Sequence, residues 1–178
     1  MTRAPLHVDP AARDGLDAAM AALDVARASG HAWAIAEAHL GLARWYSAAG
    51  ALPFSLALLE SALATVHSLD QRVELLCEHV TTLARQADEL EQRRTGSGRS
   101  VRDVAREHIF EAGSLAARVA DPCWEAQVLL HLSDVLDRFG DHADATRLQA
   151  RALRRMAGSG GEGPDPHHLP GLGRLADG

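Results

Sequence analysis

Apolar residues recur along most of the chain at steps of three and four, which is the spacing of one face of an α-helix. No segment alternates convincingly between apolar and polar residues, so no β-strand is expected. The pattern predicts an all-α fold of about seven helices between Asp9 and Ala157. Gly30, Gly50 and Gly140 interrupt it, and each suits the residue that closes a helix.

The start signals agree with these stops. Asp-Pro occurs at 9–10 and again at 121–122, and it places a capping carboxylate before a proline in the first turn. Ser68 to Gln71 resembles a capping box, and Ser100 to Asp103 restarts the pattern after TGSG. The predicted helices cover residues 10–30, 32–49, 52–67, 70–93, 100–120, 122–140 and 142–157.

Three regions follow from this pattern. Residues 1–8 are expected to be a disordered N-terminus, and residues 9–157 form one helical domain with an insertion near 85–100. Residues 158–178 are rich in Gly and Pro, so this C-terminal tail is expected to be disordered.

The predicted helix at 70–93 carries a heptad seam, with apolar residues at alternating steps of three and four. The seam consists of Val73, Leu76, Val80, Leu83, Ala87 and Leu90. Two interpretations are open. The seam packs on the following helix, or its far half pairs with another copy of the chain, which would give a homodimer through helix 70–93.

Two segments repeat each other: LARWYSAAGALPFSLALLESALA at 42–64 and LSDVLDRFGDHADATRLQARALR at 132–154. Gly50 aligns with Gly140, Ser55 with Ala145, and Ala62 with Ala152. Small residues are needed where two helices of a hairpin approach closely, because a larger side chain would overpack the gap.

This pattern resembles the tetratricopeptide repeat (TPR) family, and Ala36 and Asp70 begin equivalent helices 34 residues apart, the period of that family. The resemblance implies stacked helical hairpins in a right-handed α-solenoid. Residues 10–30 would then be the second half of a hairpin whose first half is absent. The chain departs from the family between Asp70 and Ala126, which are 56 residues apart, and it lacks the family's Trp and closing Pro.

The resemblance also implies a concave groove lined by the first helix of each hairpin. Its residues are mostly acidic or amide, so we expect it to bind a protein or peptide that is basic or extended. The alternative is that these residues are only the solvated faces of their helices. The expected groove residues are Glu37, Arg44, Gln71, Glu74, Glu78, Gln127, His131, Asp134 and Asp137. The Lys and Asn with which some family members hold acidic chaperone tails are missing.

A second candidate site is the loop QRRTGSGRSVR at 92–102. It concentrates Arg93, Arg94, Arg99 and Arg102 around small residues. Such a loop could hold a phosphate or an acidic partner, or it could be a solvated connector.

Charge and composition exclude several classes of function. The net charge of −6 gives no support for nucleic-acid binding. No apolar run reaches the roughly 18 residues that a membrane span needs, and the N-terminus lacks the apolar core of a signal peptide. Cys77 and Cys123 fit reduced, buried thiols, so we expect a cytoplasmic protein.

The sequence shows no catalytic or metal motif. Cys77 and His79 are the one close Cys–His pair, and helical spacing directs them to different sides. No phosphate-binding loop or nucleophile motif is present, so we expect no cofactor, no metal and no enzyme activity. Trp33 and Trp124 lie near the starts of equivalent helices, and both are expected in the core.

The string DPHHLPGLGR at 165–174 resembles the opening of diguanylate cyclase domains, although Pro170 replaces a Thr and the Asn before Arg174 is missing. The first functional hypothesis is a non-catalytic, TPR-like scaffold or adaptor. The alternative is a regulatory sensor for a small molecule or signalling peptide, as the N-terminal part of a bacterial TPR–diguanylate cyclase-type protein. A third hypothesis is an enzyme working through His131 and its acidic neighbours.

Overall fold

The structure is a computed structural model that describes residues 10–94 and 96–159. This part of the chain contains seven helices and no strand, which confirms the all-α prediction. The expected disorder of residues 1–8 and 160–178 falls outside the described residues, whereas Gly158 and Ser159, predicted to begin the tail, lie in the last helix. The helices are α1 (Pro10–Ser29), α2 (Ala32–Ala48), α3 (Leu52–Thr65), α4 (Leu69–Gln92), α5 (Gly98–Ala116), α6 (Pro122–Arg138) and α7 (His142–Ser159).

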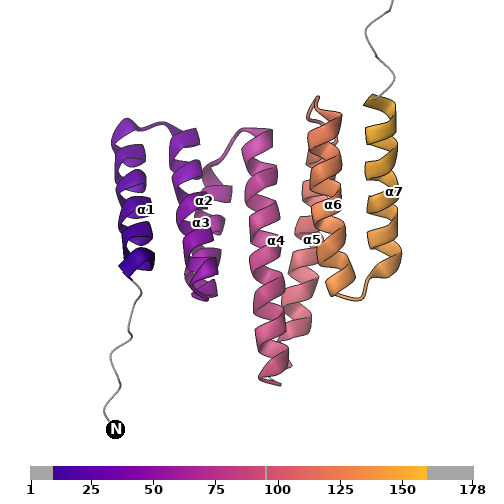
Figure 1. Cartoon of the computed structure of the whole chain (residues 1–178), viewed down its shortest axis with the longest axis horizontal. Coiled ribbons are helices and arrows are strands. Elements are labelled where there is room, and N and C mark those ends of the chain that lie inside the picture. Colours follow the sequence, from indigo (N-terminus) through magenta and orange to yellow (C-terminus); the bar gives the residue numbers. More distant parts are fainter. Residues whose placement is uncertain (1–9, 95, 160–178) are drawn as a thin grey trace, which may run out of the picture.

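The helices form two layers. Figure 1 shows α2, α4 and α6 side by side, with α3 and α5 behind them. Each helix packs on the next in the chain, and α4 also contacts both α2 and α6. We call the surface formed by α2, α4 and α6 the front face. The α-solenoid implied by the family resemblance, and its right-handed superhelix, stay predictions.

Backbone conformation explains the turns that follow α2 and α6. Gly50 has a φ of 75° and Gly140 a φ of 81°, both in the left-handed region. Nothing lies within 4 Å of a Cβ built at either position, so the conformation and not the space requires glycine. Asp121 caps α6 as predicted, because its carboxylate accepts hydrogen bonds from the backbone N–H groups of Cys123 and Trp124 at 2.9 and 3.0 Å.

Two predicted helix starts differ from the structure. Ser68 precedes α4, but its side chain makes no capping hydrogen bond, so the predicted capping box is wrong. Helix α5 begins at Gly98 and not at Ser100. A side chain at Gly98 would meet the Glu91 side chain and the Ala87 carbonyl at 2.9 and 3.1 Å, so glycine lets α5 approach α4 here.

The aligned small residues lie where paired helices cross. Ser55 and Ala62 of α3 are fully buried, and so are Ala145 and Ala152 of α7. The two hairpins therefore use the same positions for close packing. Enlarging any of these side chains would force the helices apart.

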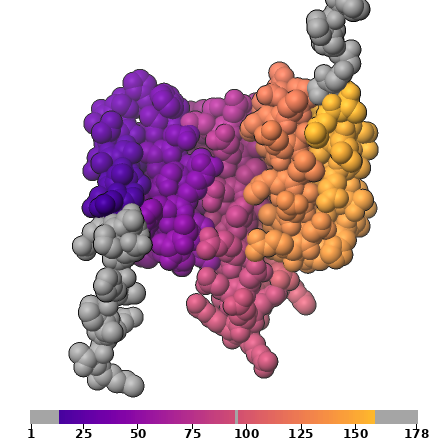
Figure 2. Space-filling view, in the orientation of Figure 1, coloured from indigo at the N-terminus to yellow at the C-terminus, as the bar shows by residue number. Residues whose placement is uncertain are grey.

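The heptad seam of α4 packs inside the chain. Val73, Leu76, Val80 and Leu83 belong to one buried cluster with residues of α5 and α6. Ala87 is buried as well, whereas Leu90 near the end of α4 is only partly buried, so the homodimer through residues 70–93 stays a prediction. The predicted insertion corresponds to the C-terminal end of α4 and the N-terminal start of α5. These two segments project from the body of the molecule in Figure 2.

An ion-pair cluster around one buried carboxylate joins α6 to α7. Glu125 is only 1% exposed and accepts hydrogen bonds from Arg151 and Arg155 at 2.7 and 2.5 Å. In the repeat alignment Glu125 of α6 has the position that Ile35 has in α2. A carboxylate therefore replaces an apolar residue in the last hairpin. Two charge-assisted bonds compensate for the burial of that carboxylate.

A pair of histidines connects α4 with α5. The Nδ1 atoms of His79 and His108 are 2.8 Å apart, so one ring donates and the other accepts. His79 is 3% exposed, and its Nε2 lies 3.9 Å from a carboxylate oxygen of Glu60 on α3. Burial, and then the neighbouring His108, lower the pKa of His79 from 6.5 to about 4.

We expect Glu125→Gln to lower the free energy of unfolding by about 2–3 kcal/mol, because it removes the charge that holds two arginines. Glu107→Gln is the control, since it removes the same charge from an exposed position on α5. Urea denaturation followed by circular dichroism measures both. Equal stability of the two variants would show that the cluster contributes nothing.

We also expect acid to destabilise the fold through His79. The unfolded chain binds a proton near pH 6.5 and the folded chain only near pH 4, so stability is present above pH 6.5 and falls as the pH drops below it. Between pH 7 and pH 5 this loss should reach about 1–2 kcal/mol. His39, whose pKa burial and Arg27 also lower, adds a contribution of the same sign.

Denaturation at several pH values, with wild type beside His79→Gln, tests this. The variant should lose the His79 part of the dependence. A pH dependence identical to that of the wild type would contradict the assignment.

Candidate functional site

The front face contains a pocket of about 280 Å³ between α4 and α6, with one wall from α2. Five of the nine residues predicted for the groove line it together. These are Arg44, Glu74, Glu78, Gln127 and His131. The remaining lining residues are Cys77, Trp124 and Val128, so charged, amide, aromatic and apolar groups meet in one concave place.

Side-chain bonds between neighbouring helices hold the pocket. Arg44 Nε donates to Glu78 Oε2 at 3.0 Å, which joins α2 to α4. The two residues are 34 apart and occupy equivalent positions of successive hairpins. Thr81 Oγ1 lies 3.0 Å from His131 Nε2, which joins α4 to α6. These two bonds link the walls of the pocket before any ligand binds.

Further cross-links occur along the same face. Arg85 donates to Ser47 Oγ at 2.7 Å, and Arg138 donates to Asp88 at 2.6 Å. None of these four residues belongs to the groove that the sequence predicts. Helical spacing could have identified Arg85 from the sequence. Steps of three and four residues lead from Glu78 to Arg85 along one face of α4.

Two carboxylates and one guanidinium line the pocket. Among the described residues Glu74 has no ion-pair partner, whereas Glu78 is paired with Arg44. Burial, and then the Glu74 and Glu78 carboxylates, raise the pKa of the Cys77 thiol to about 12. Cys77 is consequently a protonated thiol at neutral pH, which gives it little nucleophilic character.

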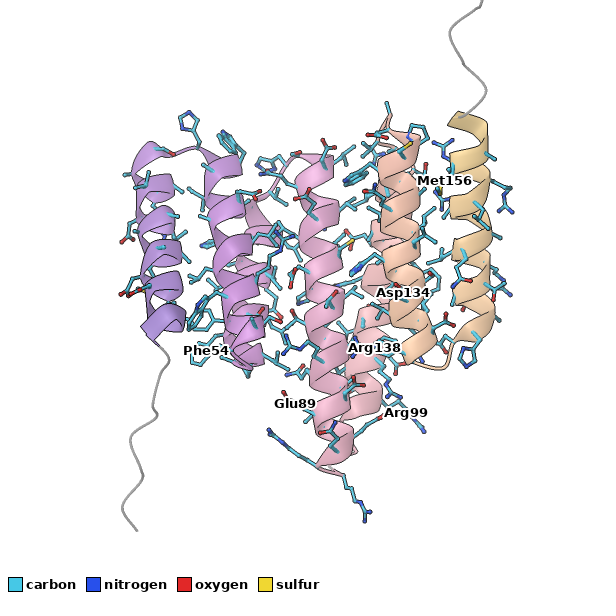
Figure 3. The ribbon with its side chains drawn as sticks, in the orientation of Figure 1. Phe54, Glu89, Arg99, Asp134, Arg138 and Met156 are labelled. Atoms are coloured by element: carbon cyan, nitrogen blue, oxygen red, sulfur yellow. The ribbon has the colours of Figure 1, made fainter. Side chains whose placement is uncertain are left out.

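Four predicted groove residues lie elsewhere. Glu37 lines a different, apolar groove between α1 and α2. The Gln71 amide donates to the Trp33 carbonyl at 2.9 Å, outside the pocket. Asp134 is exposed further along α6 (Figure 3).

Asp137 also lies outside the pocket, near the α6–α7 turn. His142 Nδ1 is 3.0 Å from one of its carboxylate oxygens, and Gln149 donates to the other at 3.3 Å. Asp137 follows Asp134 by almost one helical turn. It therefore lies near the end of α6, where it contacts α7.

The arginines of the 92–102 loop do not converge on one point. Arg102 donates to Glu91 at 2.6 Å and lies over the Phe139 ring, 5.5 Å from its centroid. Arg93 pairs with Glu89 one turn back in α4. Arg94 and Arg99 are exposed near the projecting tip, where Figure 3 labels Arg99. Arg102, one of the four arginines predicted to bind an anion, is therefore engaged in contacts within the chain.

The tryptophans correct another expectation. Trp33 at the start of α2 is exposed, not buried, and it lines the groove between α1 and α2. Trp124 is partly buried and forms part of the pocket wall.

Cys77 and His79 point to different sides of α4, toward the pocket and toward α5. In the described part of the chain no group of three or more His, Cys, Asp or Glu is placed to hold a metal ion. None of the described helices combines the length and the apolar character that crossing a bilayer requires.

No protein-family model matches the sequence, and no curated protein matches it either. Among solved structures, the chain is similar to the crystal structure of BtubC (BKLC) from P. vanneervenii. The two sequences are 16% identical, and the alignment covers 96% of this chain and 100% of BtubC with a TM-score of 0.35. A likeness at that level supports no argument about fold or function.

Proposed function

We propose that this chain is a non-catalytic, TPR-like interaction module that binds an extended protein segment across its front face. The observation that carries the proposal is the pocket, where five residues selected from the sequence come together from α2, α4 and α6. The resemblance to tetratricopeptide repeats remains part of the proposal.

The preformed walls of the pocket favour binding. A ligand need not order side chains that are already joined, as Arg44 is to Glu78 and Thr81 to His131. Fixing a surface in advance reduces the entropy lost on association. The face therefore suits recognition by shape and charge without chemistry.

The pocket favours a cationic side chain of the partner. Glu74 offers a carboxylate without an ion-pair partner among the described residues, and Trp124 offers an aromatic ring nearby. A guanidinium or ammonium group gains from both, through charge attraction and through the negative face of the ring. We therefore assign the pocket to an Arg or Lys side chain of the bound segment.

A small-molecule sensor is the second candidate, because the pocket is concave and combines apolar and polar groups. Its volume of about 280 Å³ lies just below the range of small-ligand sites. The string at 165–174 that resembles a diguanylate cyclase opening lies outside the described residues. The sensor therefore rests on the pocket alone.

We expect extended peptides that carry a central Arg to bind the chain more tightly than peptides of the same sequence with Gln or Glu there. Glu74→Gln should weaken binding of the Arg peptide about fivefold to tenfold, because it removes one charge-assisted contact. Fluorescence polarisation with labelled peptides measures the dissociation constants.

Glu107→Gln on α5 serves as the control, since it changes the net charge equally on the other layer. Tighter binding of the Glu peptide, or an equal loss of affinity in Glu74→Gln and Glu107→Gln, would contradict the assignment of the pocket to an Arg or Lys side chain. Thermal stabilisation by small molecules, with no binding of any peptide, would favour the sensor.

A further inference from the structure

An apolar groove of about 500 Å³ runs between α1 and α2. Half of its lining residues are Ala or Gly: Ala19, Ala22, Ala26, Ala34, Ala38 and Gly41. Val25 also lines the groove, although 71% of its surface is exposed. A row of small residues between two helices leaves room for the large side chains of a third.

The packing of the other front helices shows what the groove lacks. Helix α4 lies between α2 and α6, whereas α2 has α4 on one side and the groove with α1 on the other. Helix α1 is rich in Ala and other apolar residues, yet of its described residues only Leu23 and Ala26 are buried. A helix of that composition normally has more than one neighbour. A helix docked in the groove would continue the row of α2, α4 and α6.

The opposite end of the molecule presents a helix with the complementary features. Leu153 and Met156 of α7 are 63% and 50% exposed. They are three residues apart and therefore lie on adjoining parts of one helix face. Arg154 is exposed beside them and has no ion-pair partner among the described residues.

Charge complements shape. Glu37 lines the α1/α2 groove and, in the described chain, makes no ion pair. Helix α7 carries Arg147, Arg151, Arg154 and Arg155 against the single acid Asp144. An arginine of α7 can therefore compensate for Glu37 when the apolar groups dock.

We propose that the α1/α2 groove binds helix α7 of a second copy of this chain, with Leu153 and Met156 inserted among the alanines. Helices α1 and α7 lie at opposite ends of the array (Figure 1), so a chain does not fill its own groove. The contact is head to tail and leaves a free groove and a free α7 on every pair. Such an interface adds further copies unless the array closes into a ring.

The experiment uses the full chain and two variants at exposed positions, Val25→Glu in the groove and Leu153→Glu on α7. Sedimentation velocity over a range of concentrations should show wild-type oligomers that grow with concentration. Each variant alone should associate about tenfold or more weakly, because docking would bury an unpaired carboxylate. Phe110→Glu, exposed on α5, should associate as the wild type does.

Mixing the two variants gives the decisive result. The intact α7 of Val25→Glu fits the intact groove of Leu153→Glu, so the mixture should form a one-to-one dimer that does not grow. Glu37→Arg and Arg154→Glu should likewise associate weakly alone and better when mixed.

Three outcomes would overturn the proposal. A wild-type chain that stays monomeric leaves the groove to a different protein. Association blocked by Val25→Glu but not by Leu153→Glu means a two-fold pairing of grooves. Failure of the mixed variants to form a dimer removes the head-to-tail contact.

Discussion

The close approach of paired helices at alanine and serine is the contact on which the rest of the structure depends. Ser55 and Ala62 in one hairpin, and Ala145 and Ala152 in another, are buried at matching positions. Short side chains bring the backbones close, so the crossing point of each hairpin is fixed with little freedom to shift. That register aligns α2 with α4 and sets Arg44 opposite Glu78, which holds one wall of the pocket.

The last hairpin joins its helices in another way. At the position of Ile35 in α2, α6 has the buried Glu125. Arg151 and Arg155 of α7 donate hydrogen bonds to its carboxylate. An ionic contact is directional, whereas an apolar one tolerates small rotations. The cluster therefore fixes how α7 is turned about its own axis, and with it the direction in which Leu153 faces. A structural ion pair inside the hairpin thus determines what the outer surface of α7 presents.

Much of the fold could be predicted from the sequence because its signals are local. Gly50, Gly140 and Asp121 act on the backbone next to them, and the predicted helices match the structure to within a few residues. Contacts between distant residues could not be predicted in that way. The two arginines that pair with Glu125 lie 26 and 30 residues away in the sequence. No regular spacing of residues predicts these pairs. The same limit applies to the residues predicted for the groove: the period of 34 relates Arg44 to Glu78, but no spacing indicates that Glu37 lines the α1/α2 groove.

The two proposed surfaces would reinforce each other. Each chain has one cation-binding pocket on its front face, and one side chain in such a pocket gives modest affinity. Copies joined through α7 and the α1/α2 groove would carry several pockets on one assembly. A partner with basic residues along an extended segment could then bind several at once, and each later contact would form at the high effective concentration set by the first. Occupancy of the front face would therefore rise with the concentration of the chain itself.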